Sequence, residues 1–99
     1  MGRLNMEPIL AFPDGSCLVI STVRSNAGEF SCALYSAHVE RDNRAAFHPI
    51  SNHVFLGPTC LSAQEHAYGY ASRFYPQAAG SIKKPPYLIW PGPQSAGIQ

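Results

Sequence analysis

Two strand-like runs separated by a very short loop constrain this fold more than any other feature of the sequence. Residues 17–24 (CLVISTVR) and 30–39 (FSCALYSAHV) are rich in the β-branched and aromatic residues that favour strands. Residues 25–28 (SNAG) between them have the composition of a four-residue hairpin loop, in which Asn26 and Gly28 can take positive φ. A loop this short joins only antiparallel neighbours. The sequence therefore predicts a β-hairpin at the centre of the fold.

Pairing Arg24 with Glu29 gives this hairpin an expected register, which assigns each side chain to a face. The more apolar face is expected to form the core, and it carries Cys17, Val19, Val23, Phe30, Cys32 and Leu34. The other face carries Leu18, Ile20, Thr22, Ser31, Ala33, Tyr35 and Ala37. This second face is too apolar to stand fully in water, so part of it should be covered. In the same register Cys32 lies opposite Ser21, too far from Cys17 for a disulfide.

A helix is predicted from Ser62, because Ser62 and Glu65 have the spacing of a capping box. Behind this start, apolar residues recur at helical spacing on one side, at Ala63, Ala67, Tyr70, Ala71 and Phe74. The alanines are small enough to let the helix lie close against a sheet, and a proline at position 76 ends it. We expect this helix to cover the face that carries Val19, Val23, Phe30 and Leu34.

Weaker strand signals flank the hairpin. Residues 7–12 can form a short first strand, and residues 45–50 and 52–56 are strand candidates interrupted by Pro49. Together these elements predict an α+β fold, in which a three- to four-stranded antiparallel sheet is packed by one C-terminal helix.

The last 24 residues differ in composition from the rest, because they hold five of the nine prolines: Pro76, Pro85, Pro86, Pro91 and Pro93. This difference divides the chain into an α+β domain, residues 1–76, and a Pro/Gly-rich extended tail, residues 77–99. Within the tail, Tyr87, Leu88, Ile89 and Trp90 form a run too apolar to stay in water. We expect the tail to dock on the domain or on a partner.

The order of a hairpin, a further strand and a helix opened by a Ser-x-x-Glu-x-Ala phrase at Ser62, Glu65 and Ala67 resembles a known layout. It is similar to small proteobacterial β-β-β-α proteins of unknown function, over residues 16–76. The resemblance implies this fold and a bacterial host. Since those proteins have no assigned activity, it transfers no functional residue.

Composition points to a cytoplasmic protein that binds other proteins. Only 13% of the residues are charged and the net charge is +1, so much of the surface is neutral. A surface of this kind favours a protein partner or self-association. No run approaches the ~18 apolar residues of a membrane span, and residues 1–6 lack a secretion signal, so no membrane contact is expected. The three cysteines, Cys17, Cys32 and Cys60, are odd in number and have apolar neighbours, which favours reduced thiols.

Imidazole and thiol groups offer one alternative function, a metal- or thiol-dependent enzyme. The candidate metal ligands are His38, His48, His53, Cys60 and His66, but their spacings match no zinc motif. Cys60 ahead of a helix could act as a nucleophile with His66 or His53 as base, yet no orienting carboxylate accompanies it. We therefore expect no catalytic residue, no metal and no cofactor.

Nucleic-acid binding is another alternative, because a sheet with a C-terminal helix is similar to double-stranded-RNA-binding domains. Those domains place lysines at the start of the last helix, whereas this helix has no Lys or Arg before Arg73. We therefore expect no nucleic-acid partner. The favoured hypothesis is a non-enzymatic protein-interaction or regulatory module that self-associates, with contacts at Tyr35, Tyr87 and Trp90, the residue types that anchor interfaces.

Overall fold

The computed structural model describes residues 7–25, 28–39, 45–50 and 54–92. Its strands are β1 (Pro8–Ala11), β2 (Cys17–Arg24), β3 (Phe30–Val39), β4 (Ala45–Pro49) and β5 (Phe55–Gly57). A helix, α1 (Cys60–Phe74), and a short 3₁₀ helix, η1 (Pro76–Ser81), follow.

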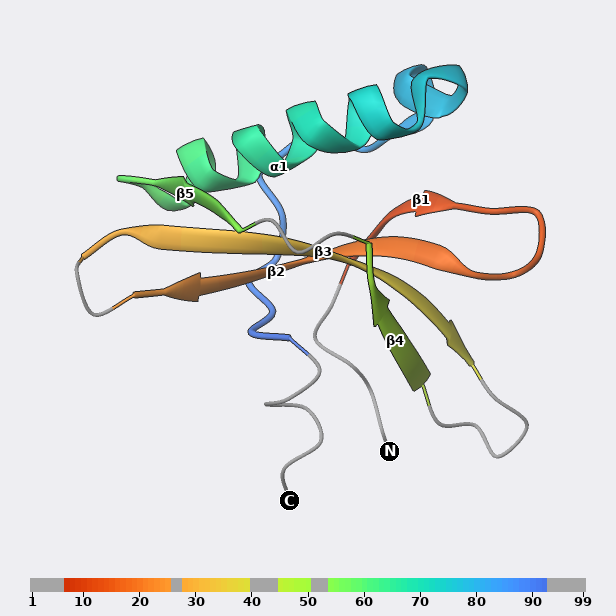
Figure 1. The fold of residues 1–99 in the computed structure, drawn as a ribbon, viewed down its shortest axis with the longest axis horizontal. Coiled ribbons are helices and arrows are strands. Elements are labelled where there is room, and N and C mark those ends of the chain that lie inside the picture. The colour runs from red at the N-terminus through yellow and green to blue at the C-terminus, as the bar shows by residue number, and fades with distance from the viewer. Residues whose placement is uncertain (1–6, 26–27, 40–44, 51–53, 93–99) are drawn as a thin grey trace.

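All strand pairs are antiparallel, in the order β1-β2-β3-β4, and β5 also pairs with β3. Helix α1 lies across one face of this sheet (Figure 1). The predicted α+β class, an antiparallel sheet packed by one helix, is confirmed, and the sheet has five strands rather than three or four. Among the described residues, no helix has the length and apolar content needed to cross a membrane.

The register of the central hairpin differs from the prediction by one residue. Arg24 pairs with Phe30 rather than with Glu29, and Cys32 lies opposite Thr22 rather than Ser21. The hairpin closes on Ser25, whose N–H donates to the Glu29 carbonyl at 2.7 Å, and Gly28 takes φ +86° as expected. Asn26 lies outside the described residues.

A shift of one residue exchanges the faces of one strand relative to the other. The predicted faces are therefore wrong. One face, which we call the helix face, combines Leu18, Ile20 and Thr22 with Phe30, Cys32 and Leu34, and the opposite face combines Val19 with Tyr35 and Ala37.

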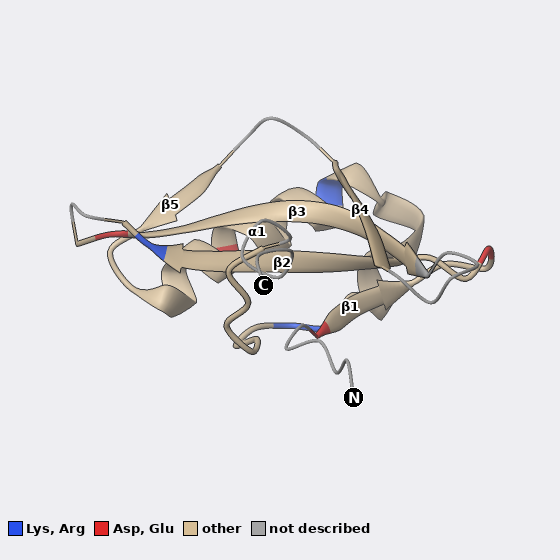
Figure 2. Cartoon of the chain, turned by 90° about the horizontal axis from the view of Figure 1, so that it is seen from below, with Lys and Arg blue, Asp and Glu red and all other residues tan. Residues whose placement is uncertain are grey.

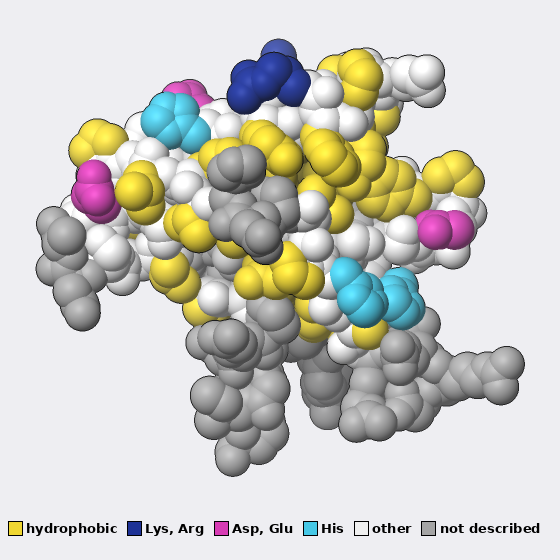
Figure 3. Space-filling model, in the orientation of Figure 1, with side chains coloured by type: hydrophobic (Ala, Val, Ile, Leu, Met, Phe, Trp, Pro, Cys, Tyr) yellow, Lys and Arg dark blue, Asp and Glu magenta, His cyan; other side chains and the backbone are white. Residues whose placement is uncertain are grey.

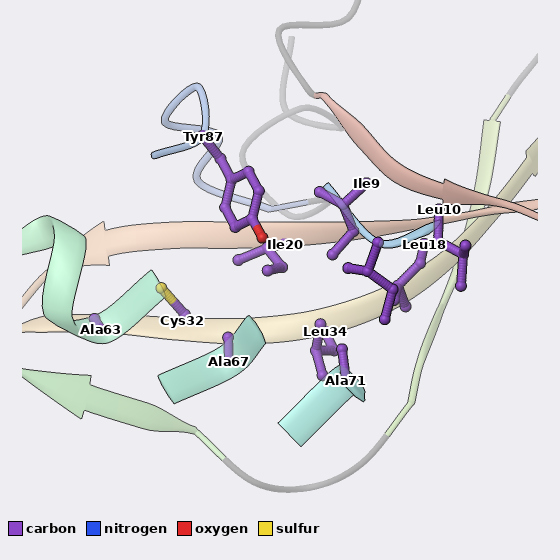
Figure 4. Close-up of a cluster of buried hydrophobic side chains, with 11 residues drawn as sticks. Ile9, Leu10, Leu18, Ile20, Cys32, Leu34, Ala63, Ala67, Ala71 and Tyr87 are labelled. Atoms are coloured by element: carbon purple, nitrogen blue, oxygen red, sulfur yellow. The ribbon is translucent and has the colours of Figure 1, made fainter. Parts of the chain in front are cut away.

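The helix-face core brings the sheet against the small residues of α1 (Figure 4). Ala63, Ala67 and Ala71 are fully buried, as their spacing predicts, and they pack over Cys32 and Leu34. The helix does not cover Val19, because Val19 points to the opposite face. The sequence therefore predicted the three buried alanines correctly, whereas Phe74 of the same predicted side is 49% exposed. The predicted place of the helix on the sheet is wrong.

Helix α1 begins earlier than predicted, with Thr59 as its N-cap. The Thr59 side chain accepts from the Ser62 N–H at 3.0 Å, and Ser62 Oγ accepts from the Thr59 N–H at 3.1 Å. Ser62 thus closes the capping box instead of opening it, and Glu65 is exposed. Two possible capping boxes overlap in this sequence, Thr59 with Ser62 and Ser62 with Glu65. The first one forms, and it makes the helix one turn longer at its start.

The chain after α1 is helical first and extended later. Residues 76–81 form η1, although the sequence favours an extended segment from Pro76 onward. Residues 82–92, here called the strap, then run beside β1 and pass from the α1 side of the sheet to its other side (Figure 1). The Lys83 N–H donates to the Ile9 carbonyl at 2.9 Å, and the Thr22 N–H donates to the Trp90 carbonyl at 2.7 Å. The strap is therefore hydrogen-bonded to both β1 and β2.

Candidate interaction surface

The face of the sheet opposite α1 carries no charged side chain among the described residues of β2, β3 and β4. We call it the strap face, because the end of the strap lies on it. Its side chains alternate with those of the helix face, and they are Cys17, Val19, Ser21, Val23, Ser31, Ala33, Tyr35, Ala37, Ala45, Phe47 and Pro49. Figure 2 shows the sheet from this side, with charged residues at the ends and edges of the sheet. This surface meets water without a charged group at its centre.

Trp90 anchors the strap on this face. Its side chain is 2% exposed and packs with Val19 and Ala37. The Tyr35 ring meets it edge-on at 5.9 Å between centroids, and the Phe47 ring lies 5.1 Å away. The structure therefore brings together two of the three sequence-predicted contacts, Tyr35 and Trp90, and adds Phe47.

The third predicted contact, Tyr87, lies on the other side of the sheet. Its side chain is 7% exposed in the helix-face core, and its hydroxyl donates to the Lys83 carbonyl. Burial raises the pKa of the Tyr87 phenol above its usual value. The sheet separates Tyr87 from the Tyr35 and Trp90 rings, so the three residues form no single patch.

Gln64 holds the strap in place, a role that the sequence does not indicate. Its side chain is fully buried. Its amide forms two hydrogen bonds with the backbone of Tyr87, in the way that a peptide group of a neighbouring strand would. Gln64 Oε1 accepts from the Tyr87 N–H at 2.9 Å, and Gln64 Nε2 donates to the Tyr87 carbonyl at 3.3 Å. Nε2 also donates to Thr22 Oγ1 at 3.2 Å. One side chain of α1 thus joins the helix to the strap and to β2.

Glu7 makes a second attachment for the strap. Its carboxylate accepts from the Leu88 N–H at 2.9 Å and forms an ion pair with Lys83. Between these attachments and Trp90, the side chains of Leu88 and Ile89 are exposed. The strap is therefore fixed along its backbone.

The strap face is only partly covered by Trp90. Ala37, under the indole, is buried, whereas Ser31, Ala33, Tyr35 and Phe47 are half-buried. Val23 at the end of β2 is 39% exposed. Among the described residues, the exposed part is therefore an uncharged surface with large rings beside small residues.

The candidate metal ligands do not gather at one place. The rings of His38 and His48 stack at 5.5 Å between centroids, whereas Cys60 and His66 belong to α1. His66 donates from Nδ1 to the Leu56 carbonyl at 2.8 Å. His53 lies outside the described residues. Within the described ranges, no group of three or more His, Cys, Asp or Glu side chains is placed to hold a metal ion.

The three cysteines are free thiols in the structure. Cys32 is buried beside Thr22, and this burial raises the pKa of its thiol, which favours the unreactive protonated form. Cys17 and Cys60 are half-buried, and burial raises the pKa of Cys17 too. Of the two bases predicted for a Cys60 nucleophile, His66 donates from Nδ1 to the Leu56 carbonyl, and His53 lies outside the described residues.

A small polar groove lies near the β1–β2 turn, lined by Asp14, Gly15, Ser16, Ser36 and His38. Asp14 accepts from the Ser16 N–H at 2.9 Å and from the Ser16 hydroxyl at 2.6 Å. These hydrogen bonds hold the pKa of the Asp14 carboxyl below its usual value. Both hydrogen bonds lie within the β1–β2 turn, so the Asp14 carboxylate stabilises this turn.

The described cations are spread over separate elements. Arg24 ends β2, Arg73 lies on α1, and Lys83 and Lys84 begin the strap (Figure 2). On the face drawn in Figure 3, the charged side chains are few and lie apart from one another. Comparisons with protein-family models, with curated proteins and with solved structures found no match. The functional conclusions therefore rest on the chemistry of the described residues.

Proposed function

We propose that this chain is a non-enzymatic protein-interaction module that binds its partner through the strap face. The observation that carries this proposal is the absence of charge from the described residues of this face on β2, β3 and β4, where aromatic side chains remain half-exposed. Buried centres of protein interfaces are depleted in charged residues and enriched in aromatic ones. Binding here would remove apolar surface from water and would desolvate no ion.

The three predicted contact residues take different roles in this proposal. Tyr35 touches the partner, because its ring stands half-exposed on β3. Trp90 supports Tyr35 from the side and fixes the shape of the face. Tyr87 holds the strap against α1 through its pairing with Gln64. A surface already fixed in the free protein loses little conformational entropy when it binds.

Two further expectations stay predictions alongside this one. A cytoplasmic location agrees with the free thiols of Cys17, Cys32 and Cys60. The resemblance to small proteobacterial β-β-β-α proteins suggests a bacterial host.

A capture experiment tests the proposal with the full chain as bait. A chain ending at residue 76 would be unsuitable, because it would lack Ile82, Tyr87 and Trp90, which are part of the packed clusters. The bait is compared with Tyr35→Arg, which places a charge on the strap face. Leu61→Arg is the matched control, since Leu61 is 44% exposed on α1, the other side of the sheet.

We expect a protein retained by the unchanged chain and by Leu61→Arg, and retained at least ~10-fold less by Tyr35→Arg, the effect of a hot-spot residue. Equal retention by all three baits, or retention by none, would contradict the proposal. A parallel arm without nuclease addresses the alternative function. Material retained only in that arm would favour nucleic-acid binding instead.

A further inference from the structure

We infer that the partner is an extended segment of another protein, which adds a strand to the outer edge of β4. This inference rests on the proposed function and names the form of the partner, whose apolar side chains would lengthen the strap face. Strand β4 is the last strand in the order β1-β2-β3-β4, so only one of its edges is paired within the sheet. The backbone of β4 shows which groups the outer edge offers.

Alternate residues of β4 direct their backbone groups away from β3. The Ile50 N–H, just beyond the end of β4, donates to the Leu34 carbonyl at 3.0 Å. Backbone groups alternate between the two sides of an antiparallel strand, so those of His48 also face β3 and those of Phe47 face outward. Pro49 fits this assignment, because a strand tolerates proline where the missing N–H would face away from the neighbouring strand. The outward groups are therefore the N–H and carbonyl of Ala45 and Phe47 and the carbonyl of Pro49.

The other edges of the sheet receive partners from the chain itself. The strap accepts from the Thr22 N–H of β2 and donates to the Ile9 carbonyl of β1. On β5, the Leu56 carbonyl accepts from the His66 ring. Within the residues that the structure describes, no segment makes such a bond to the outer side of Phe47. In this part of the chain, β4 is the edge that remains able to pair with another strand.

The edge also indicates the side chains of the partner. In an added antiparallel strand, the residues opposite Ala45, Phe47 and Pro49 direct N–H and carbonyl groups to β4, and their side chains lie on the strap face. Apolar residues suit these positions, because the neighbouring Phe47 ring is half-buried and packs with Trp90. The residue opposite the exposed His48 lies on the helix face, where a carboxylate or hydroxyl can bond to the imidazole. The partner segment therefore alternates apolar and polar residues.

A second copy of β4 fits this edge less well than such a segment. Two β4 strands paired about a two-fold axis at Phe47 would set Ala45 of one copy opposite Pro49 of the other. Because proline has no N–H, both Ala45 carbonyls would lack a partner in this pairing. A segment without proline at the matching positions bonds to every outward group of β4. The edge therefore favours a strand from another protein.

The peptide acetyl-Val-Glu-Val-Thr-Val-amide is a probe of defined sequence for the full chain. Antiparallel to β4, its valines lie opposite the outward residues and its glutamate lies opposite His48. We expect the peptide to shift the amide resonances of residues 45–48 in the ¹⁵N-labelled chain and to leave those of α1 unchanged. The dissociation constant should be on the order of 1 mM, since a few exposed hydrogen bonds supply the affinity.

Two N-methylated forms of this peptide provide the matched control. A methyl group on the central valine nitrogen replaces an N–H that faces β4, whereas a methyl group on the threonine nitrogen faces away from it. The first form should bind at least ~10-fold more weakly than the unmodified peptide, and the second should bind within about threefold of it.

Two substitutions at the edge should change the affinity in opposite directions. Ala45→Pro removes an outward N–H at the first residue of β4, where proline is tolerated, and should weaken binding of the peptide ~2–10-fold. Pro49→Ala adds an outward N–H and should strengthen binding by a similar factor. Pro49→Ala keeps the test valid if Ala45→Pro disturbs the sheet.

Equal binding of the two N-methylated peptides would overturn the inference, and so would unshifted resonances of residues 45–48 at ~5 mM peptide. If the full chain then still retained a protein in a Tyr35-dependent way, the proposed function would stand without the added strand.

Discussion

Gln64 shows how one side chain can set the path of a distant segment. It lies on α1, and its amide satisfies both backbone groups of Tyr87, 23 residues later in the chain. The same amide reaches Thr22 on β2, whose hydroxyl contacts the Cys32 thiol at 3.5 Å. Because these groups are buried, no water is expected to replace a lost partner.

Replacing Gln64 with leucine should therefore destabilise the protein strongly. Gln64→Leu keeps the side-chain size but leaves the Tyr87 N–H and carbonyl unpaired, at a cost of ~1–3 kcal/mol for each group. We expect a loss of roughly 2–6 kcal/mol in the free energy of unfolding, measured by urea denaturation.

Gln77→Leu is the control for this substitution, because Gln77 is exposed on η1. It should change stability by less than ~0.5 kcal/mol. If the two variants proved equally stable, the pairing of Gln64 with the strap would not contribute as described.

The role of Gln64 was hidden in the sequence for a physical reason. Gln64, Ala67 and Ala71 share one side of the helix, so its position on the buried stripe can be derived from spacing. A polar residue on such a stripe normally indicates the edge of the buried face. Only the path of the strap supplies its hydrogen-bond partners, and that path depends on contacts far apart in sequence.

At the scale of elements, local signals predicted the strands well and their register poorly. Strands β2 and β3 have the predicted bounds, because β-branched and aromatic residues specify them locally. The register depends on a difference between the two faces, and here both faces are apolar. When both faces are apolar, a shift of one residue still places apolar side chains on each face. The hydrophobic pattern therefore could not distinguish the two registers.

Gly57 lies where β5 approaches the start of α1, and this close approach can be tested by substitution. A Cβ added at Gly57 would stand 2.3 Å from Ser62 Oγ and 2.6 Å from the backbone nitrogen of Ala63. Gly57→Ala should therefore destabilise the protein by ~1–3 kcal/mol, the usual cost of overpacking. Thermal unfolding of the variant measures this.

Gly69, within α1, provides the matched glycine-to-alanine substitution. Its nearest neighbour would be the Arg73 guanidinium, 3.8 Å from an added Cβ, which is ordinary contact. Gly69→Ala should stabilise the protein by ~0.5–1 kcal/mol, because alanine favours the helix. Changes of the same sign in both variants would contradict the close approach of β5 to the start of α1.

At the scale of the whole molecule, the sheet is packed on both faces by segments that follow it in the chain. Helix α1 covers one face, and Trp90 of the strap covers part of the other. Composition divides the chain after residue 76, but Ile82, Tyr87 and Trp90 pack in the same clusters as the strands. The need to cover the second face could be derived from sequence, whereas the residue that covers it required the structure.

The central claim is that the exposed part of the strap face is the surface through which this protein makes contact. Amide chemical shifts of the ¹⁵N-labelled full chain, followed on dilution from ~1 mM to ~20 μM, test it most directly, because a weak contact dissociates over this range. We predict the largest shifts at residues 31–37 and 45–47 and at the Trp90 indole, with α1 little changed. Shifts confined to α1 and η1 would contradict the claim, and a spectrum unchanged on dilution would contradict self-association.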